Sequence, residues 1–127
     1  MLLPGKEVAK YCNGVKKIHP SGVDIVPKSV FRLPDECQAI IDGDKRGFLM
    51  NGKFVDFKSS LQKIEANKGY YELEPGRYIV IFPKIRIPLS YTGFAYPRST
   101  FNRLGIAKSQ TAVFDPGYEG AWNQLFI

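Results

Sequence analysis

The chain has 127 residues, of which 44% are hydrophobic and 24% charged, and it carries a formal net charge of +6. This length fits one domain with a hydrophobic core, and the composition is that of a folded protein rather than a low-complexity one. The positive charge favours an anionic partner, but the basic residues are scattered, so no stable nucleic-acid complex is expected.

The cysteines and the N-terminus exclude several classes of protein. Cys12 and Cys37 are far apart in the sequence and form neither a CxxC metal or redox spacing nor a disulfide framework. Residues 1–10 carry charge too early for a signal peptide, and no apolar run is long enough to cross a membrane. We therefore expect a single soluble, cytoplasmic domain over residues 1–127 that makes no membrane contact.

The first predicted element is a short helix over residues 4–12, with Pro4 in its first turn and Asn13-Gly14 at its end. Strand-forming residues follow it. Residues 22–33 are rich in β-branched side chains and are interrupted by Pro27, which predicts an edge strand or a bend. Asn51-Gly52 lies between two apolar runs and predicts a hairpin.

The second half of the chain continues in the same way. Glu74-Pro75-Gly76 lies between apolar runs and predicts a second hairpin over residues 70–82, and short strands are expected at 84–88, 89–96 and 111–114. Many short strands with almost no helix predict an all-β sandwich or jelly-roll-like barrel. Residues 122–127 have the pattern of a strand that stops in mid-run, so either this end pairs in a sheet or a C-terminal portion is missing; we expect the second.

Elimination narrows the possible chemistry. The single histidine, His19, precedes a proline in a turn, and a surface histidine is the favoured interpretation over part of a nucleophile system. The sequence has no Walker A loop, no GxGxxG motif, and neither the HxE nor the PCxxC element of a zinc deaminase. Magnesium held by carboxylates and phosphate stays open.

The stretch from Pro97 to Gly105 has the residues of a phosphate cradle. Ser99 or Thr100 is a good helix N-cap and Gly105 a good C′ residue, with room for little more than one turn between them. Arg98 and Arg103 flank the free N–H groups of such an N-terminus, and arginine suits phosphate because its planar fork donates two parallel hydrogen bonds. The alternative is a capped turn with two solvated arginines, which this stretch alone slightly favours.

Two aspartates in turns change this balance. Asp115-Pro116-Gly117-Tyr118 alone indicates only a hairpin turn, and Asp24 alone only the start of a strand. Together with the arginine–hydroxyl stretch they fit a nucleotide hydrolase. One aspartate orients or deprotonates a water, the tyrosine lies against a sugar ring, and the second carboxylate helps to hold magnesium.

The three stretches resemble, in order and spacing, the motifs of the superfamily of trimeric dUTPases and dCTP deaminases. SGVDI (21–25) resembles the first dUTPase motif, PRSTFNRLGI (97–106) the second in its deaminase-like and archaeal form, and TAVFDPGYEG (111–120) the third. The resemblance covers roughly residues 20–25 and 73–120 and is closest to archaeal-type dUTPases. It implies a distorted jelly-roll or β-clip barrel with a short N-terminal helix and one short helical turn.

The resemblance also implies roles for the residues of the second motif. Arg98, Ser99 and Thr100 would bind the β- and γ-phosphates, and Ser99 would also polarise the bridging oxygen. Arg103 matches the second arginine of the deaminase-type motif and would add a phosphate contact.

The other two motifs supply the sugar, metal and base contacts that the resemblance implies. Asp115 would contact the deoxyribose 3′-OH and activate the attacking water, and Tyr118 would pack under the sugar. Asp24 would hold Mg²⁺ through water. The base pocket would be lined by Gln110, Thr111 and Ala112.

Leu125 separates the two branches of the superfamily. The deaminases carry a catalytic glutamate ten positions after the aspartate of the third motif, and here this position is a leucine, which cannot shuttle protons. The sequence therefore favours a dUTP diphosphatase of nucleotide metabolism that hydrolyses dUTP to dUMP and pyrophosphate with Mg²⁺. The resemblance also implies a homotrimer with sites shared between subunits. The alternatives are a dCTP deaminase, a bifunctional dCTP deaminase/dUTPase, and a non-catalytic β domain that binds nucleotide or nucleic acid. The fourth motif and glycine-rich arm of many dUTPases do not occur in residues 1–127, so we expect C-terminal motifs to be missing from the chain shown.

Overall fold

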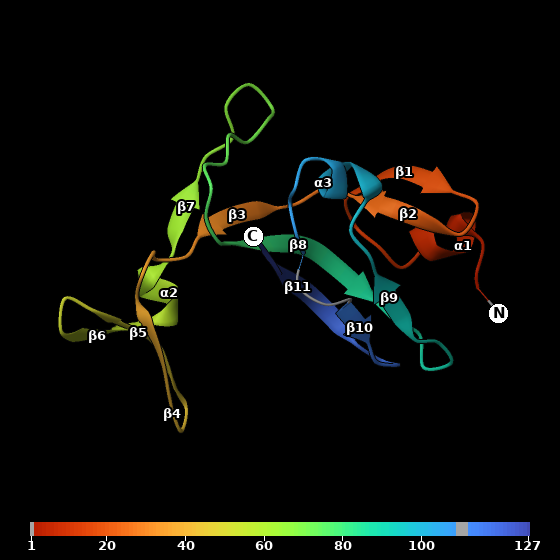
Figure 1. The fold of residues 1–127 in the computed structure, drawn as a ribbon. Coiled ribbons are helices and arrows are strands. Elements are labelled where there is room, and N and C mark those ends of the chain that lie inside the picture. Colours follow the sequence, from red (N-terminus) through yellow and green to blue (C-terminus); the bar gives the residue numbers. More distant parts are fainter. Residues whose placement is uncertain (1, 109–111) are drawn as a thin grey trace.

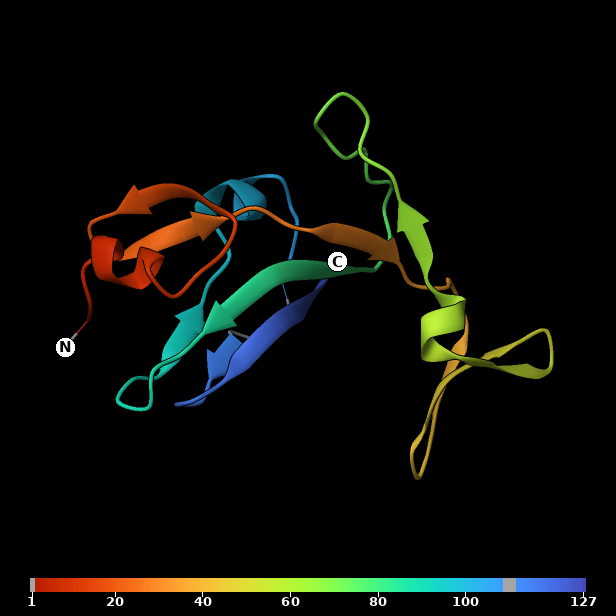
Figure 2. The same cartoon turned by 180° about the vertical axis from the view of Figure 1, so that it is seen from behind.

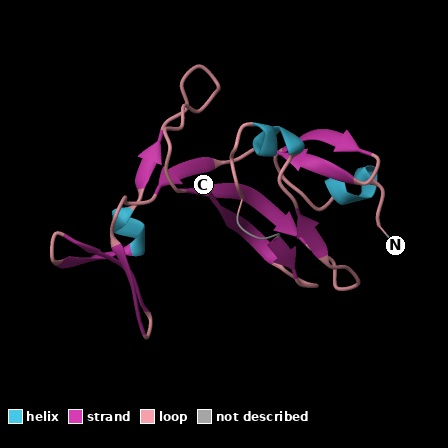
Figure 3. Ribbon diagram, viewed as in Figure 1, coloured by secondary structure: helices cyan, strands magenta, loops and turns pink. Residues whose placement is uncertain are grey.

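In the computed structural model, residues 2–108 and 112–127 are described, and strands dominate them (Figure 1). Figure 3 shows that the helices are short, and no described helix is long and apolar enough to span a membrane. The described elements are, in order, α1 (Gly5–Ala9), β1 (Val15–His19), β2 (Gly22–Ile25), β3 (Ser29–Arg32), β4 (Gln38–Asp42), β5 (Lys45–Met50), β6 (Lys53–Asp56), α2 (Phe57–Ser60), β7 (Gln62–Ile64), β8 (Tyr78–Arg86), β9 (Gly93–Ala95), α3 (Ser99–Arg103), β10 (Ala112–Phe114) and β11 (Glu119–Phe126).

The hydrophobic core lies on an antiparallel sheet of order β11-β8-β3-β7. Strand β8 is its centre, because it pairs with β3 on one edge and with β11 on the other. Its side chains alternate between buried and half-buried positions from Tyr78 to Phe82, as expected of a strand with one face against a core. The buried cluster comprises Val30, Tyr78, Val80, Phe82 and Phe126.

The remaining strands form smaller sheets around this one. The hairpin β1–β2 and the pair β9–β10 lie beside one end of β8, and β4–β5–β6 form an arm that projects from the other end in both views (Figure 2). Pro27, which has no N–H to donate, lies between β2 and β3, where the chain leaves one sheet and enters another. The expected all-β fold with a short N-terminal helix and a helical turn is confirmed, but the described strands do not close into a barrel.

One predicted hairpin forms and the other does not. Asn51 and Gly52 both have positive φ, 50° and 76°, and join β5 to β6 as expected of a tight hairpin turn. The hairpin expected around Glu74-Pro75-Gly76 is wrong, because no described strand precedes β8 there. Both edges of β8 are already paired, with Tyr78 opposite Arg32 on one side and Phe126 on the other, so residues before the turn have no strand to join.

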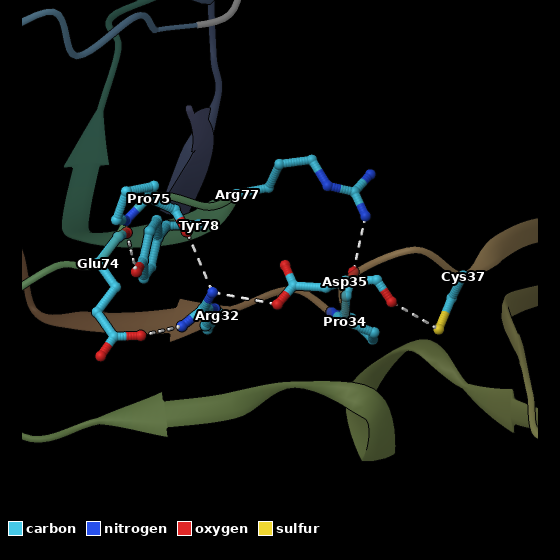
Figure 4. A network of polar contacts seen from close by, with 8 residues as sticks. All are labelled: Arg32, Pro34, Asp35, Cys37, Glu74, Pro75, Arg77 and Tyr78. Carbon is cyan, nitrogen blue, oxygen red and sulfur yellow. Dashed lines mark hydrogen bonds and ion pairs between the residues drawn. The ribbon is translucent and has the colours of Figure 1, made fainter.

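Polar contacts hold the Glu74-Pro75-Gly76 segment against the end of β3 instead (Figure 4). The guanidinium of Arg32 contacts Glu74 Oε2 at 3.1 Å and donates to the carbonyl of Pro75 at 3.1 Å. Its third partner is Asp35 Oδ2, also at 3.1 Å. The hydroxyl of Tyr78 donates to the carbonyl of Glu74 at 2.6 Å, so one network fixes both the turn and the start of β8.

Candidate functional site

Helix α3 begins one residue earlier than predicted. Arg98 is the N-cap, with φ −72° and ψ 150°, and no side chain caps the helix by a hydrogen bond. Ser99 is therefore the first helical residue, and the expectation that Ser99 or Thr100 serves as the N-cap is wrong. Arg98 has the extended conformation of an N-cap and directly follows Pro97. Ser99 and Thr100 are exposed, and neither side chain caps the helix by a hydrogen bond.

The other end of α3 is fixed by a Schellman motif. Gly105 has φ +72° and donates its N–H to the carbonyl of Asn102 at 3.1 Å, and Ile106 donates to the carbonyl of Phe101 at 2.8 Å. The predicted C′ position of Gly105 is confirmed. Phe101 and Ile106 pack against the core cluster, and the Phe101 ring meets Phe126 edge-on at 5.6 Å. These contacts fix α3 on the central sheet, with the side chains of Arg98 and Arg103 exposed at its two ends.

The first motif lies on the β1–β2 hairpin. His19 pairs with Gly22 and Lys17 with Asp24, so a two-residue turn, Pro20-Ser21, joins the strands. Side chains alternate across a strand, and the side chains of Lys17, His19 and Asp24 therefore share one face. Asp24 is the least exposed of the site's charged groups, at 16% of its side chain.

Two donors from different elements meet on one oxygen of Asp24. Oδ2 lies 2.9 Å from Nε2 of His19 on β1 and 3.0 Å from Nη1 of Arg98 at the start of α3. The hydrogen bond from His19 contributes most to lowering the pKa of the Asp24 carboxyl; the charge of Arg98 adds to this, while partial burial acts in the opposite direction. Asp24 is therefore an ionised acceptor, and its contact with Arg98 joins the first and second motifs in space.

His19 was expected to be a surface histidine, and the structure adds a contact to Asp24 that the sequence did not predict. Its side chain is 37% exposed and its ring nitrogen is engaged by Asp24. The sequence held a usable signal, because a two-residue turn at Pro20-Ser21 places His19 diagonally across from Asp24 on the same face. The sequence alone does not show that this turn has only two residues.

A glycine contact sets the position of the hairpin against α1. The N–H of Gly5 donates to the carbonyl of Pro20 at 3.1 Å. A Cβ at this position would collide with the carbonyl oxygens of His19 and Gly22. Only glycine allows the helix to approach so closely, and the backbone that carries His19 is held by this packing.

Asp115 and Tyr118 are not brought to the Asp24–Arg98 contact. β10 pairs with β9 so that Ala112 lies opposite Ala95 and Phe114 opposite Gly93. Asp115 directly follows Phe114 and so lies at the Gly93 end of this pair. Arg98 comes three residues after Ala95 and so lies beyond the other end; the course of both strands can be followed in Figure 1. Within one chain, Asp115, which is predicted to activate water, and Arg98, which is predicted to bind phosphate, therefore lie at opposite ends of the β9–β10 pair.

The turn that carries Asp115 is well anchored. Tyr118 donates its N–H to the carbonyl of Asp115 at 3.1 Å, and Gly117, with φ +84°, donates to Ile87 at 2.9 Å. The Tyr118 ring packs on Phe114 at 5.7 Å, and its hydroxyl donates to the carbonyl of Ala121 at 2.6 Å. The Asp115 carboxylate is exposed, so it is open to water and to a ligand.

The predicted base pocket is described only in part. Ala112 is half-buried at the start of β10, and Gln110 and Thr111 lie outside the described residues. Leu125 is half-buried on β11 opposite Ile79, so the position expected from the resemblance to match the deaminase glutamate holds an apolar side chain.

The described residues hold no group of three or more His, Cys, Asp or Glu side chains that could bind a metal ion. A depression of about 510 Å³ lies beside His19, between α1 and the hairpin. Another, of about 490 Å³, lies at Arg32 and Tyr78 and contains none of the residues with a predicted role.

The chain is similar to known proteins across most of its sequence. Residues 4–126 match the family model described as dCTP deaminase-like. The chain is 35% identical over 128 residues to the probable deoxyuridine 5′-triphosphate nucleotidohydrolase of Aeropyrum pernix, a match that covers 100% of this chain and 75% of that protein. No solved structure shows a significant match.

Two further archaeal relatives bear the same name. The chain is 34% identical over 106 residues to the deoxyuridine 5′-triphosphate nucleotidohydrolase of Methanocaldococcus jannaschii, which covers 83% of this chain and 62% of that protein. It is 31% identical over 112 residues to the probable enzyme of Methanosarcina barkeri, covering 87% of this chain and 60% of that protein. Because the family model spans nearly the whole sequence, the protein belongs to the dCTP deaminase-like family, within the superfamily of dUTPases and dCTP deaminases.

Proposed function

We propose that this protein is a dUTP diphosphatase that hydrolyses dUTP to dUMP and pyrophosphate. The observation that carries the proposal is the contact of Asp24 with Arg98, which unites the first two motifs in a chain whose named relatives are dUTP nucleotidohydrolases. Leu125 supports the hydrolase over the deaminase, since deamination requires a proton-shuttling side chain at that position.

The phosphate-binding group of this proposal stands on and before α3. Arg98 uses one Nη1–H for Asp24, and its guanidinium has further N–H donors for a phosphate oxygen. The exposed hydroxyls of Ser99 and Thr100 follow directly, and Arg103 ends the helix. Donors placed in advance around the β- and γ-phosphates stabilise the negative charge that develops on the leaving pyrophosphate.

Asp115 is the proposed base. It accepts a proton from a water molecule whose oxygen forms a bond to the α-phosphorus, while the bond from that phosphorus to the bridging oxygen breaks and pyrophosphate leaves. Tyr118 is held in the same turn and offers a ring face to the deoxyribose. The base pocket includes Ala112, with Gln110 and Thr111 as the remaining predicted members.

Magnesium fits the site only together with the substrate. Asp24 offers a single carboxylate, and one of its oxygens is occupied by His19 and Arg98. Magnesium commonly takes one or two carboxylates along with water and substrate phosphates, so Asp24 would hold it through water. When bound, the ion would neutralise charge on the triphosphate.

The proposed homotrimer with shared sites is supported by the placement of Asp115 and Arg98 at opposite ends of the β9–β10 pair, because a second copy would then bring the two groups together. The outer face of the β9–β10 pair is a fitting contact surface: Phe94, Tyr96 and Val113 are 54%, 70% and 58% exposed. Phe94 and Val113 are register partners, and the rings of Phe94 and Tyr96 stack at 6.4 Å. A contiguous apolar face of this kind is typical of an interface.

Incubation with dUTP or dCTP, with and without magnesium, tests the proposal. Release of pyrophosphate from dUTP is the expected result, whereas ammonia from dCTP would identify a deaminase. Binding of dUTP without turnover would identify a non-catalytic nucleotide-binding domain. The cytoplasmic location expected from the sequence stays a prediction.

A further inference from the structure

We propose that His19 is a positioning residue of this site: it fixes the carboxylate of Asp24, which in turn fixes the guanidinium of Arg98 toward phosphate. The inference rests on the proposed function, because phosphate is the ligand that Arg98 is assigned there. It goes beyond that function by giving a role to a side chain outside the three motifs.

The geometry of the shared oxygen carries the inference. Asp24 Oδ2 accepts from His19 Nε2 at 2.9 Å and from Arg98 Nη1 at 3.0 Å. The two donors approach from separate elements, one from the end of β1 and one from the N-cap of α3. A carboxylate held by only one long side chain can rotate with it, whereas a second donor from a paired strand fixes its orientation.

Exposure explains why Arg98 needs such support. Its side chain is 57% exposed, whereas that of Asp24 is 16% exposed. A half-exposed arginine samples many rotamers, and ordering it on binding costs conformational entropy. An Asp24 carboxylate that is already oriented by His19 holds Arg98 in place before phosphate arrives, which lowers that cost.

The hydrogen bond also determines where the imidazole proton lies. An ionised carboxylate can only accept, so Nε2 of His19 must carry a hydrogen. The backbone of His19 is fixed in turn by the close packing of Gly5 against the hairpin and by its pairing with Gly22. The ring is therefore presented to Asp24 from a rigid support.

Binding of inorganic pyrophosphate, measured by calorimetry, tests this role with two substitutions of His19. His19→Leu keeps side-chain bulk but removes the donor, and we expect the dissociation constant to rise about 5- to 10-fold, as for loss of one hydrogen bond of ordinary strength. His19→Gln keeps an N–H donor of similar reach, and we expect affinity within about 2-fold of the unmodified protein. Lys16→Leu alters an exposed neighbour on the same strand and serves as the control.

Steady-state kinetics with dUTP separates positioning from general damage. His19→Leu should raise KM by the same factor while kcat stays unchanged, and His19→Gln should restore KM. Thermal unfolding of each variant verifies that it is folded. Equal pyrophosphate affinity of His19→Leu and the unmodified protein would overturn the inference.

Nitrogen-15 NMR of the imidazole tests the hydrogen bond without any substitution of His19. His19 is the only histidine of the chain, so its ring signals need no assignment. We expect Nε2 to carry a hydrogen and its resonance to move in Asp24→Asn and on addition of pyrophosphate. An Nε2 without hydrogen, or one indifferent to Asp24→Asn, would overturn the inference.

The outcomes for the two proposals are distinct. A protein that turns over dUTP but binds pyrophosphate equally well with and without the His19 donor contradicts the positioning role alone. A protein that shows the expected loss of pyrophosphate affinity in His19→Leu, yet never turns over dUTP, contradicts the proposed function alone.

Discussion

Arg98 and Asp24 form an ion pair of 3.0 Å that connects the N-cap of α3 to strand β2. The contact joins two short segments that belong to different parts of the fold and have no strand pairing with each other. It gives the molecule an arginine that is exposed to solvent and yet anchored. The predictions below begin from this pair.

Replacing Arg98 should weaken substrate binding more than it damages the fold. Arg98→Lys keeps the charge but loses the planar fork, and we expect KM for dUTP to rise about 10-fold or more, because lysine offers a point charge instead of two parallel donors. Steady-state kinetics measures this. Arg46→Lys, an exposed change on β5, is the matched control and should leave KM unchanged; an unchanged KM in Arg98→Lys would contradict the assignment.

Replacing Asp115 should remove turnover and retain binding. Asp115→Asn keeps the size of the side chain but removes the base, and we expect kcat to fall by about 100-fold or more. Calorimetry with dUTP should show nearly unchanged affinity. Glu119→Gln provides the control, since Glu119 lies in the same segment but pairs with Lys84 at 2.9 Å. A kcat of Asp115→Asn close to that of the unmodified protein would contradict the mechanism.

A methyl group at Gly5 should destabilise the protein. Gly5→Ala places a Cβ against the carbonyl oxygens of His19 and Gly22, so α1 and the hairpin must separate, and we expect a loss of about 1–3 kcal/mol in the free energy of unfolding. Urea denaturation measures the change. Gly22→Ala is the matched control, because no atom lies within 4 Å of a Cβ there. Similar losses in both variants would argue against this packing.

Acid should remove the contribution of Asp24 to stability. The pKa of its carboxyl is lowered in the folded protein, first by the His19 hydrogen bond and then by the charge of Arg98. A lowered pKa in the folded state stabilises the protein above the ordinary aspartate value of about 4, and this contribution is lost as pH falls through the folded value. The difference in unfolding free energy between the unmodified protein and Asp24→Asn should therefore be largest near neutral pH and shrink toward pH values of about 3 and below. A difference independent of pH would contradict the ion pair.

Mixing two inactive variants should restore activity if sites are shared. Refolding Arg98→Ala together with Asp115→Asn lets one copy supply Asp115 and another supply Arg98, and about a quarter of the sites should then be intact. Activity of the mixture, compared with each variant alone, is the measurement. Phe94→Glu should separate the copies in light scattering and abolish turnover, whereas Phe54→Glu on the β6 strand should do neither. No recovery on mixing would place the complete site within one chain.

Local signals in the sequence predicted local structure well. The left-handed turn at Asn51-Gly52, the C′ glycine of α3 and the break at Pro27 each depend on the backbone preferences of one or two residues. The hairpin before β8 failed because β3 and β11 occupy both edges of that strand, a tertiary fact that no window of sequence contains. Closure of the strands into a barrel was likewise a matter of long-range pairing.

The candidate site was predictable only in pieces. Arg98 and Asp24 were assigned from the resemblance of their motifs, and the structure adds that the two side chains form an ion pair. His19 was discounted because a lone histidine beside a proline carries no signal until the register of its hairpin is known. The N-cap is Arg98, one residue before the predicted Ser99, and the side-chain preferences of Ser99 and Thr100 do not show this difference.

The pairing of β8 on both edges determines which parts of the molecule can open locally. Its amides are held by two neighbouring strands and covered by the core, so they open only when the whole sheet opens. The β1–β2 hairpin is paired only with itself, and α3 is a single turn, so both can open at a smaller cost in free energy. The segments that carry Asp24 and Arg98 therefore depend on contacts between elements, such as their own ion pair and the packing of Phe101 on Phe126, to stay in place.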